Sequence, residues 1–92
     1  MKVYELVSTI GYTKNILSHI VFFVWDDEIS DGITIRQCSA DDYIHLCGRD
    51  VLEWCPLEDF EIEDNNSKAG ISITVAMEKH DNYIFYHYIK KN

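Results

Sequence analysis

Hydrophobic and polar residues alternate along three stretches of this chain, at residues 2–10, 33–37 and 71–77. A period of two residues is the pattern of a half-buried β-strand. The alternation is most regular in 71–77, where Ile, Val and Met take turns with Ser, Thr and Ala. Each of the three stretches is therefore predicted to be a strand.

Residues 16–25 are apolar on both faces of an extended chain and are rich in β-branched and aromatic side chains. That composition favours a central strand, covered on both faces. A buried helix is the alternative, because a short apolar run does not distinguish the two by periodicity.

Turn residues connect these strands into two hairpins. Asp31 and Gly32 form a typical turn, which joins 16–25 to 33–37. The polar residues 78–82 separate 71–77 from the aromatic stretch 83–89. The second pair is predicted to form a C-terminal hairpin.

One short helix is predicted over residues 40–47. Ser39 precedes it as a possible N-cap, and Asp41 and Asp42 fall in the first turn, where negative charge is favoured. Gly48 follows as a possible C-terminal stop.

The fold class that follows is α+β. Short acidic segments at 50–54 and 59–62 flank Pro56, which fits an edge strand or a bend because proline cannot donate to a central ladder. We expect a single small domain over residues 1–92, with a mainly antiparallel, twisted sheet of roughly five to seven strands and one short helix.

Charge is distributed unevenly along the chain. Thirteen of the 16 carboxylates lie in residues 26–64 together with only two basic residues, so this part is formally −11 (2 minus 13) and the rest +3 (6 minus 3). Such a field attracts basic surfaces and repels nucleic acid and anionic membranes. We therefore expect a basic protein surface as partner, and neither direct nucleic-acid binding nor membrane binding.

The function predicted from this charge is a small acidic protein-interaction module that is not an enzyme. Spaced carboxylates can imitate a phosphate backbone, which suggests a nucleic-acid mimic that inhibits a nucleic-acid-handling enzyme, as nuclease immunity proteins and phage anti-defence or anti-CRISPR proteins do. This is an analogy of size and charge alone. The predicted contact residues are Asp26, Asp27, Glu28, Glu58, Asp59, Glu61, Glu63 and Asp64.

Two alternatives belong to other classes. The first is a structural or regulatory subunit that binds a protein through the aromatic C-terminal hairpin, with Tyr86 and Tyr88 as contacts. The second is an enzyme that holds a divalent cation at the acidic turn of residues 26–32, although this turn matches no complete cation-binding loop.

The cysteines predict packing and neither metal binding nor catalysis. Cys38, Cys47 and Cys55 are spaced too widely for a zinc knuckle, even with His45 nearby, so no metal and no cofactor is expected. Their odd number argues against a disulfide framework and for a reducing compartment. The longest apolar run is about half of a membrane-spanning length. We therefore expect a cytoplasmic protein.

Overall fold

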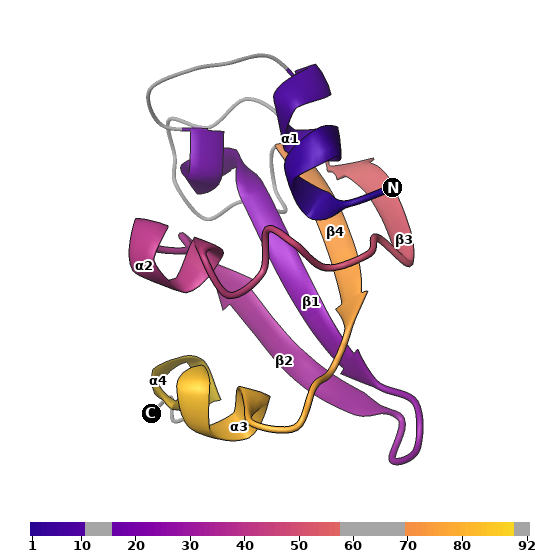
Figure 1. Ribbon diagram of the computed structural model, residues 1–92, viewed down its shortest axis with the longest axis vertical. Coiled ribbons are helices and arrows are strands. Elements are labelled where there is room, and N and C mark those ends of the chain that lie inside the picture. Colours follow the sequence, from indigo (N-terminus) through magenta and orange to yellow (C-terminus); the bar gives the residue numbers. More distant parts are fainter. Residues whose placement is uncertain (11–15, 58–69, 90–92) are drawn as a thin grey trace.

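A four-stranded mixed sheet forms the centre of the computed structural model, which describes residues 1–10, 16–57 and 70–89. The strand order is β2-β1-β4-β3 (Figure 1). The strands are β1 (Ile20–Asp26), β2 (Asp31–Arg36), β3 (Glu53–Leu57) and β4 (Gly70–Ala76). β1 pairs antiparallel with β2 and parallel with β4, and β3 pairs antiparallel with β4. The α+β class is confirmed at this level, and the sheet is mixed, not purely antiparallel, because one of its three strand pairs is parallel.

The first hairpin and the central strand were predicted correctly, but the turn was not, because it covers residues 27–30 and Asp31 and Gly32 belong to β2. β1 and β2 pair from Val21 opposite Arg36 to Asp26 opposite Asp31. Residues 16–19 instead form the 3-10 helix η1 (Ile16–His19), so the central strand is shorter than its apolar run. β4 matches the most regular alternation, and β3 is an edge strand that contains Pro56, as expected. The segment 59–62 lies outside the described residues.

The strand predicted at residues 2–10 is wrong, because this segment is the helix α1 (Val3–Ile10). Val3, Leu6 and Val7 also have helical spacing, and these are the residues that pack into the core. The amide groups of Val3 and Tyr4 donate to carbonyl oxygens of residues 49 and 47, which satisfies the first turn of the helix. The strand pattern and the helix pattern coexist here, and tertiary hydrogen bonds favour the helix.

The prediction of a C-terminal hairpin is also wrong. In place of a last strand the chain forms α3 (Asp81–Ile84) and α4 (Tyr86–Ile89), and β4 takes β1 and β3 as its partners. Phe85 is fully buried, and Ile84 and Tyr88 pack against the core beside it. This spacing of apolar side chains, at i, i+1 and i+4, is helical.

The predicted helix at 40–47 is confirmed only in its first turn, as α2 (Ala40–Tyr43). Ser39 is its N-cap: the Ser39 Oγ accepts a hydrogen bond of 3.1 Å from the Asp42 amide. Residues 44–48 continue as turns. The expectation of one helix was wrong, since the described residues contain α1, α3 and α4 as well.

The hydrophobic core lies on one face of the sheet, which the helices cover (Figure 1). It joins Phe22 and Val24 of β1 to Leu6 of α1, to Leu46 and to Phe85. The opposite face of β1 carries Val21, Phe23 and Trp25, which do not belong to this core. Trp25 stands at the last of these positions, where β1 ends.

Candidate functional site

Three acidic residues, 26–28, follow directly on Trp25: Asp26 ends β1, and Asp27 and Glu28 begin the turn of residues 27–30 that connects β1 to β2. Residues 26–28 are called the acidic turn below. Its geometry is held locally. The Asp26 Oδ1 accepts a hydrogen bond of 3.0 Å from the Glu28 amide, and the Asp31 Oδ1 accepts one of 2.8 Å from the Gly32 amide. Hydrogen bonds that a nearby backbone amide donates to an aspartate carboxylate stabilise tight turns. Three carboxylates that the sequence predicted as contacts, Asp26, Asp27 and Glu28, are thereby gathered at one end of the sheet.

The Trp25 side chain is positioned by two neighbours. It stands opposite Gly32, where an added methyl group would lie 3.1 Å from the Trp25 Cε3 atom, so the absence of a side chain makes room for the indole ring. The indole Nε1–H donates to the Asp27 Oδ1 at 3.1 Å. The residue is nevertheless 39% exposed. A large aromatic ring is thus fixed at the surface beside the acidic turn.

Trp25 and the acidic turn line an open cleft of about 460 Å³ at this end of the sheet. Three segments form it: the β1–β2 turn, the residue before β3, and the connection from β4 to α3. Its lining residues are Trp25, Asp26, Asp27, Glu28, Leu52, Ala76, Met77, Glu78, Lys79 and Asn82. Backbone hydrogen bonds hold the segments together, because the Met77 amide donates to Trp25 and the Leu52 amide to Thr74.

The lining combines negative charge with apolar surface. It contains four carboxylates and one ammonium group, a formal charge of −3 (1 minus 4), together with Trp25, Leu52 and Met77. Glu78 is separated by 50 residues from Glu28 in the sequence, and only the tertiary structure brings its carboxylate to the cleft. Charges on low-dielectric walls focus the electrostatic field and raise the local concentration of cations.

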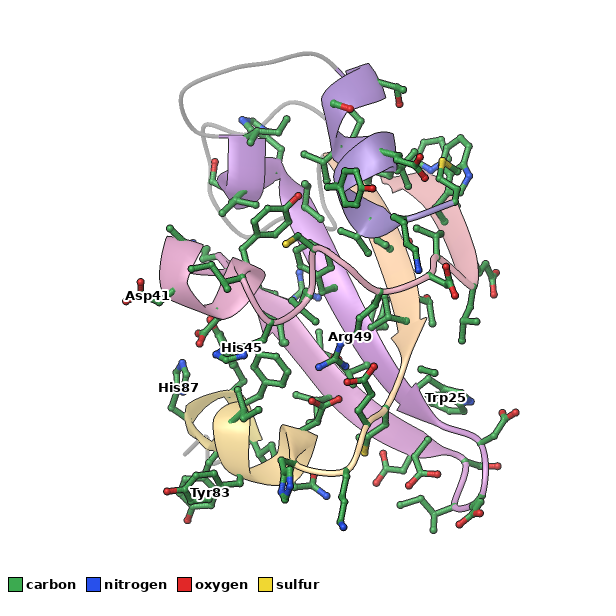
Figure 2. All side chains as sticks on the ribbon, viewed as in Figure 1. Trp25, Asp41, His45, Arg49, Tyr83 and His87 are labelled. Atoms are coloured by element: carbon green, nitrogen blue, oxygen red, sulfur yellow. The ribbon has the colours of Figure 1, made fainter. Side chains whose placement is uncertain are left out.

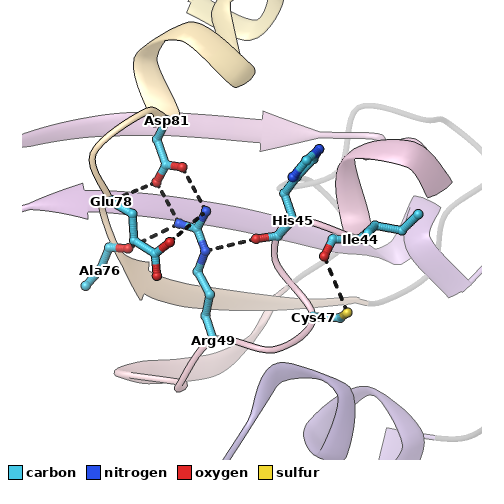
Figure 3. A network of polar contacts seen from close by, with 7 residues as sticks. All are labelled: Ile44, His45, Cys47, Arg49, Ala76, Glu78 and Asp81. Atoms are coloured by element: carbon cyan, nitrogen blue, oxygen red, sulfur yellow. Dashed lines mark hydrogen bonds and ion pairs between the residues drawn. The ribbon is translucent and has the colours of Figure 1, made fainter.

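Glu78 is positioned by the buried ion pair of Arg49 and Asp81 (Figure 3). Its amide donates to the Asp81 Oδ2 at 2.8 Å, and its Oε1 lies 3.6 Å from the Arg49 Nη2. Its side chain remains 63% exposed. The loop after β4 is therefore fixed through its backbone while the Glu78 carboxylate stays accessible.

Arg49 supplies the rigid support for this loop. Its guanidinium donates to both carboxylate oxygens of Asp81, at 2.6 and 2.8 Å, and to the backbone oxygens of His45 and Ala76 (Figure 3). The hydrogen bonds to Asp81 raise the pKa of Arg49. Arg49 is one of the two basic residues of the acidic part, and its charge is used inside the protein, which leaves the cleft acidic.

The remaining predicted contacts, Glu58, Asp59, Glu61, Glu63 and Asp64, lie outside the described residues. Sequence reasoning missed seven of the ten lining residues, among them Trp25, Leu52 and Glu78. Trp25 offered a signal, since it stands next to three acidic residues and ends an apolar strand. Leu52 and Glu78 offered none, because nothing near them in the sequence indicates which turn they face.

The two tyrosines predicted as secondary contacts have different surroundings on α4. Tyr86 is exposed, whereas Tyr88 is partly buried and its hydroxyl donates to the Asp42 Oδ2 at 2.7 Å. Burial and this hydrogen bond raise the pKa of Tyr88. Tyr83 on α3 is 84% exposed, and Figure 2 shows it far from Trp25. Tyr88 therefore supports the fold, whereas Tyr83 and Tyr86 are exposed on these two helices.

The cysteines lie apart in the fold. Cys38 is buried in the core, Cys47 is half-buried and Cys55 is exposed on β3. Burial, followed by the nearby Asp42 carboxylate, raises the pKa of the Cys38 thiol from 9.0 to about 12. Within the described ranges, no three His, Cys, Asp or Glu side chains gather closely enough to hold a metal ion.

No family model matches this chain, and neither a curated protein nor a solved structure matches it. In the part of the chain that the structure describes, no helix is long and apolar enough to cross a membrane.

Proposed function

We propose that this protein is a small acidic interaction module that binds a basic protein surface, without catalysis, through the rim of the Trp25 cleft. The observation that carries the proposal is the convergence of carboxylates from two distant segments, residues 26–28 and Glu78, around one open cleft. Complementary charge of this kind speeds association and selects among partners.

The partner class that fits best is a nucleic-acid-handling enzyme, such as a nuclease, whose basic channel the acidic module occupies in place of a phosphate backbone. The net charge of −8 supports this proposal, as does its concentration in residues 26–64. Arg49 supports it too, because its ion pair with Asp81 leaves few basic groups to oppose the acidic rim. Carboxylates at residues 58–64 stay predicted contacts of the same partner.

Two matched double charge reversals test the proposal. Glu28→Lys with Glu78→Lys alters the cleft, and Asp41→Lys with Glu53→Lys alters exposed positions elsewhere; each pair changes the net charge from −8 to −4. The partner is captured from a lysate of the source cell at low salt and eluted at high salt. Association rates of the purified partner are then measured for each variant over a salt series.

The cleft variant is expected to associate at least about tenfold more slowly at low salt, since steering contributes factors of ten or more to association rates. The control variant should keep most of the rate. Equal slowing of both variants would mean that net charge acts without a defined site, and an unchanged rate in the cleft variant would exclude the cleft.

A second candidate function is a structural or regulatory subunit that binds protein through α3 and α4. The exposure of Tyr83 and Tyr86 favours it, because aromatic side chains at surfaces are typical of contact sites. The salt series separates the two functions, since an aromatic interface loses little affinity as ionic strength rises. In that case Tyr83→Ala and Tyr86→Ala would abolish binding and the charge reversals would not.

A further inference from the structure

We infer that the cleft binds the guanidinium group of an arginine side chain on a protein partner, seated between the Trp25 indole and the Glu78 carboxylate. This inference rests on the proposed function and adds to it the chemistry of the contacting residue.

The indole of Trp25 is exposed and positioned for such a contact. The indole N–H is hydrogen-bonded to Asp27, Gly32 leaves room beside the ring, and Trp25 lines the cleft while 39% of the residue stays exposed. A cation over the face of a tryptophan is attracted by the negative charge of its π-system. Because the ring is already fixed, little rotamer entropy is lost when the cation binds.

The charge around the ring is complementary to a large, flat cation. The lining has four carboxylates and one ammonium group, that of Lys79, and the Arg49 guanidinium, which binds Asp81 with both of its oxygens, lies 3.6 Å from the Glu78 carboxylate. Asp26, Asp27 and Glu28 supply three of these carboxylates from consecutive positions, and Glu78 supplies the fourth from the connection after β4. A guanidinium presents five donors in a plane and can meet acceptors on several sides.

Apolar groups in the lining suit the rest of an arginine side chain. Leu52 and Met77 line the cleft together with Trp25. They can cover the methylene stem while the charged head reaches the carboxylates. Lysine fits less well, because an ammonium is more strongly hydrated and stacks poorly on an aromatic ring. The volume of about 460 Å³ lies within the range of about 300–1000 Å³ that is usual for ligand pockets.

The test uses the full chain, labelled with ¹⁵N, and three capped hexapeptides of arginine, lysine or citrulline at low salt. The protein has two tryptophans, so the indole N–H signal of Trp25 reports on the cleft and that of Trp54, on edge strand β3, serves as an internal control. Trp25→Leu removes the ring, Trp25→Phe keeps an aromatic face, and Trp54→Leu is the matched control variant.

We expect hexa-arginine to shift the Trp25 signal more than the Trp54 signal and to bind about three- to fivefold more tightly than hexa-lysine, which corresponds to an exposed cation–π contact. Hexa-citrulline should not bind. Trp25→Leu should remove the preference for arginine, Trp25→Phe should restore part of it, and Trp54→Leu should leave it unchanged. The wild-type signals and the affinity ratio test the inference even if a variant does not fold.

Equal affinities for the arginine and lysine peptides, with an unshifted Trp25 signal, would overturn this inference. Salt-dependent binding of both peptides would then still support the proposed function. Failure of both peptides to bind at low salt would contradict the inference and the proposed function together.

Discussion

Arg49 and Asp81 form a bidentate ion pair with N–O distances of 2.6 and 2.8 Å, and their side chains are only 9% and 1% exposed. The pair joins the segment before β3 to the start of α3, across 32 residues of sequence. The Asp81 carboxylate also accepts a hydrogen bond from the Glu78 amide. One buried interaction therefore positions both the C-terminal helices and the Glu78 side of the acidic cleft.

Breaking this pair on one side should destabilise the protein strongly. For Arg49→Met or Asp81→Asn we expect a loss of about 3–5 kcal/mol in the free energy of unfolding, because the remaining partner stays buried without the charge that the bidentate ion pair supplied. Urea unfolding of each variant, followed by circular dichroism, measures the loss.

The matched control is the exposed ion pair of Lys2 and Asp50, whose N–O distance is 3.1 Å. Asp50→Asn should cost less than about 1 kcal/mol, since solvent screens exposed charges. Similar losses at Asp50 and Asp81 would show that burial of the Arg49 pair does not govern its energetics.

Tyr88→Phe should lower the free energy of unfolding by about 1.5 kcal/mol. The substitution removes the hydroxyl that donates to the Asp42 carboxylate at 2.7 Å and keeps the ring that packs beside Phe85. Tyr83→Phe removes a hydroxyl from a residue that is 84% exposed and should have no measurable effect. Thermal unfolding of the two variants measures the difference in stability. Equal stability of Tyr88→Phe and Tyr83→Phe would contradict a stabilising role of the Tyr88 hydroxyl.

Gly32→Ala should destabilise the first hairpin by about 1–3 kcal/mol. An added methyl group would collide with the backbone oxygen of Val24, which cannot move without disturbing β1, and would press on the Trp25 ring. Gly48→Ala is the control, because its added methyl group meets no atom within 4 Å. Denaturant midpoints measure both effects, and the indole N–H signal of Trp25 in ¹⁵N spectra serves as a local probe. A Gly32→Ala variant as stable as Gly48→Ala would contradict the predicted collision.

Stability should fall in alkaline solution as the pH rises from about 9 towards 12. The pKa of Cys38 is raised from 9.0 to about 12 by burial, so the folded state keeps its proton while the unfolded state releases it. The stabilisation is complete below pH 9 and is lost through this window, with a slope of at most about 1.4 kcal/mol per pH unit for one group.

Cys38→Ala should therefore flatten the dependence of the unfolding free energy on pH above 9, although it also lowers stability at neutral pH by removing a buried side chain. Cys55→Ala, at an exposed residue, should leave the slope unchanged. Urea unfolding at a series of pH values gives the slopes, and parallel slopes in the wild type and Cys38→Ala would rule out this role of the thiol.

Residue patterns predicted the secondary structure correctly where the local pattern and the tertiary environment agree. β1 has apolar side chains on both faces and is a central strand, β4 has strict alternation, and Ser39 caps α2 as a short polar side chain can. The predicted charge of the β1–β2 turn likewise needs no fold, since Asp26, Asp27 and Glu28 adjoin in the chain.

Patterns failed where two periodicities fit the same residues. Val3, Leu6 and Val7 fit a helix as well as a strand, and the carbonyl oxygens of residues 47 and 49 favour the helix by accepting its first amides. The aromatic segment 83–89 likewise becomes α3 and α4, because burial of Phe85 and the Arg49–Asp81 pair hold it beside the sheet.

The sequence by itself determined the acidic character of the protein, its α+β class and the strands of the first hairpin, because charge, apolar content and short-range alternation are local properties. Only the tertiary structure decided that β4 lies parallel to β1 and that Trp25, Leu52 and Glu78 meet around one cleft. These relations depend on contacts between segments far apart in sequence, whose energies of packing and ion pairing no local pattern encodes.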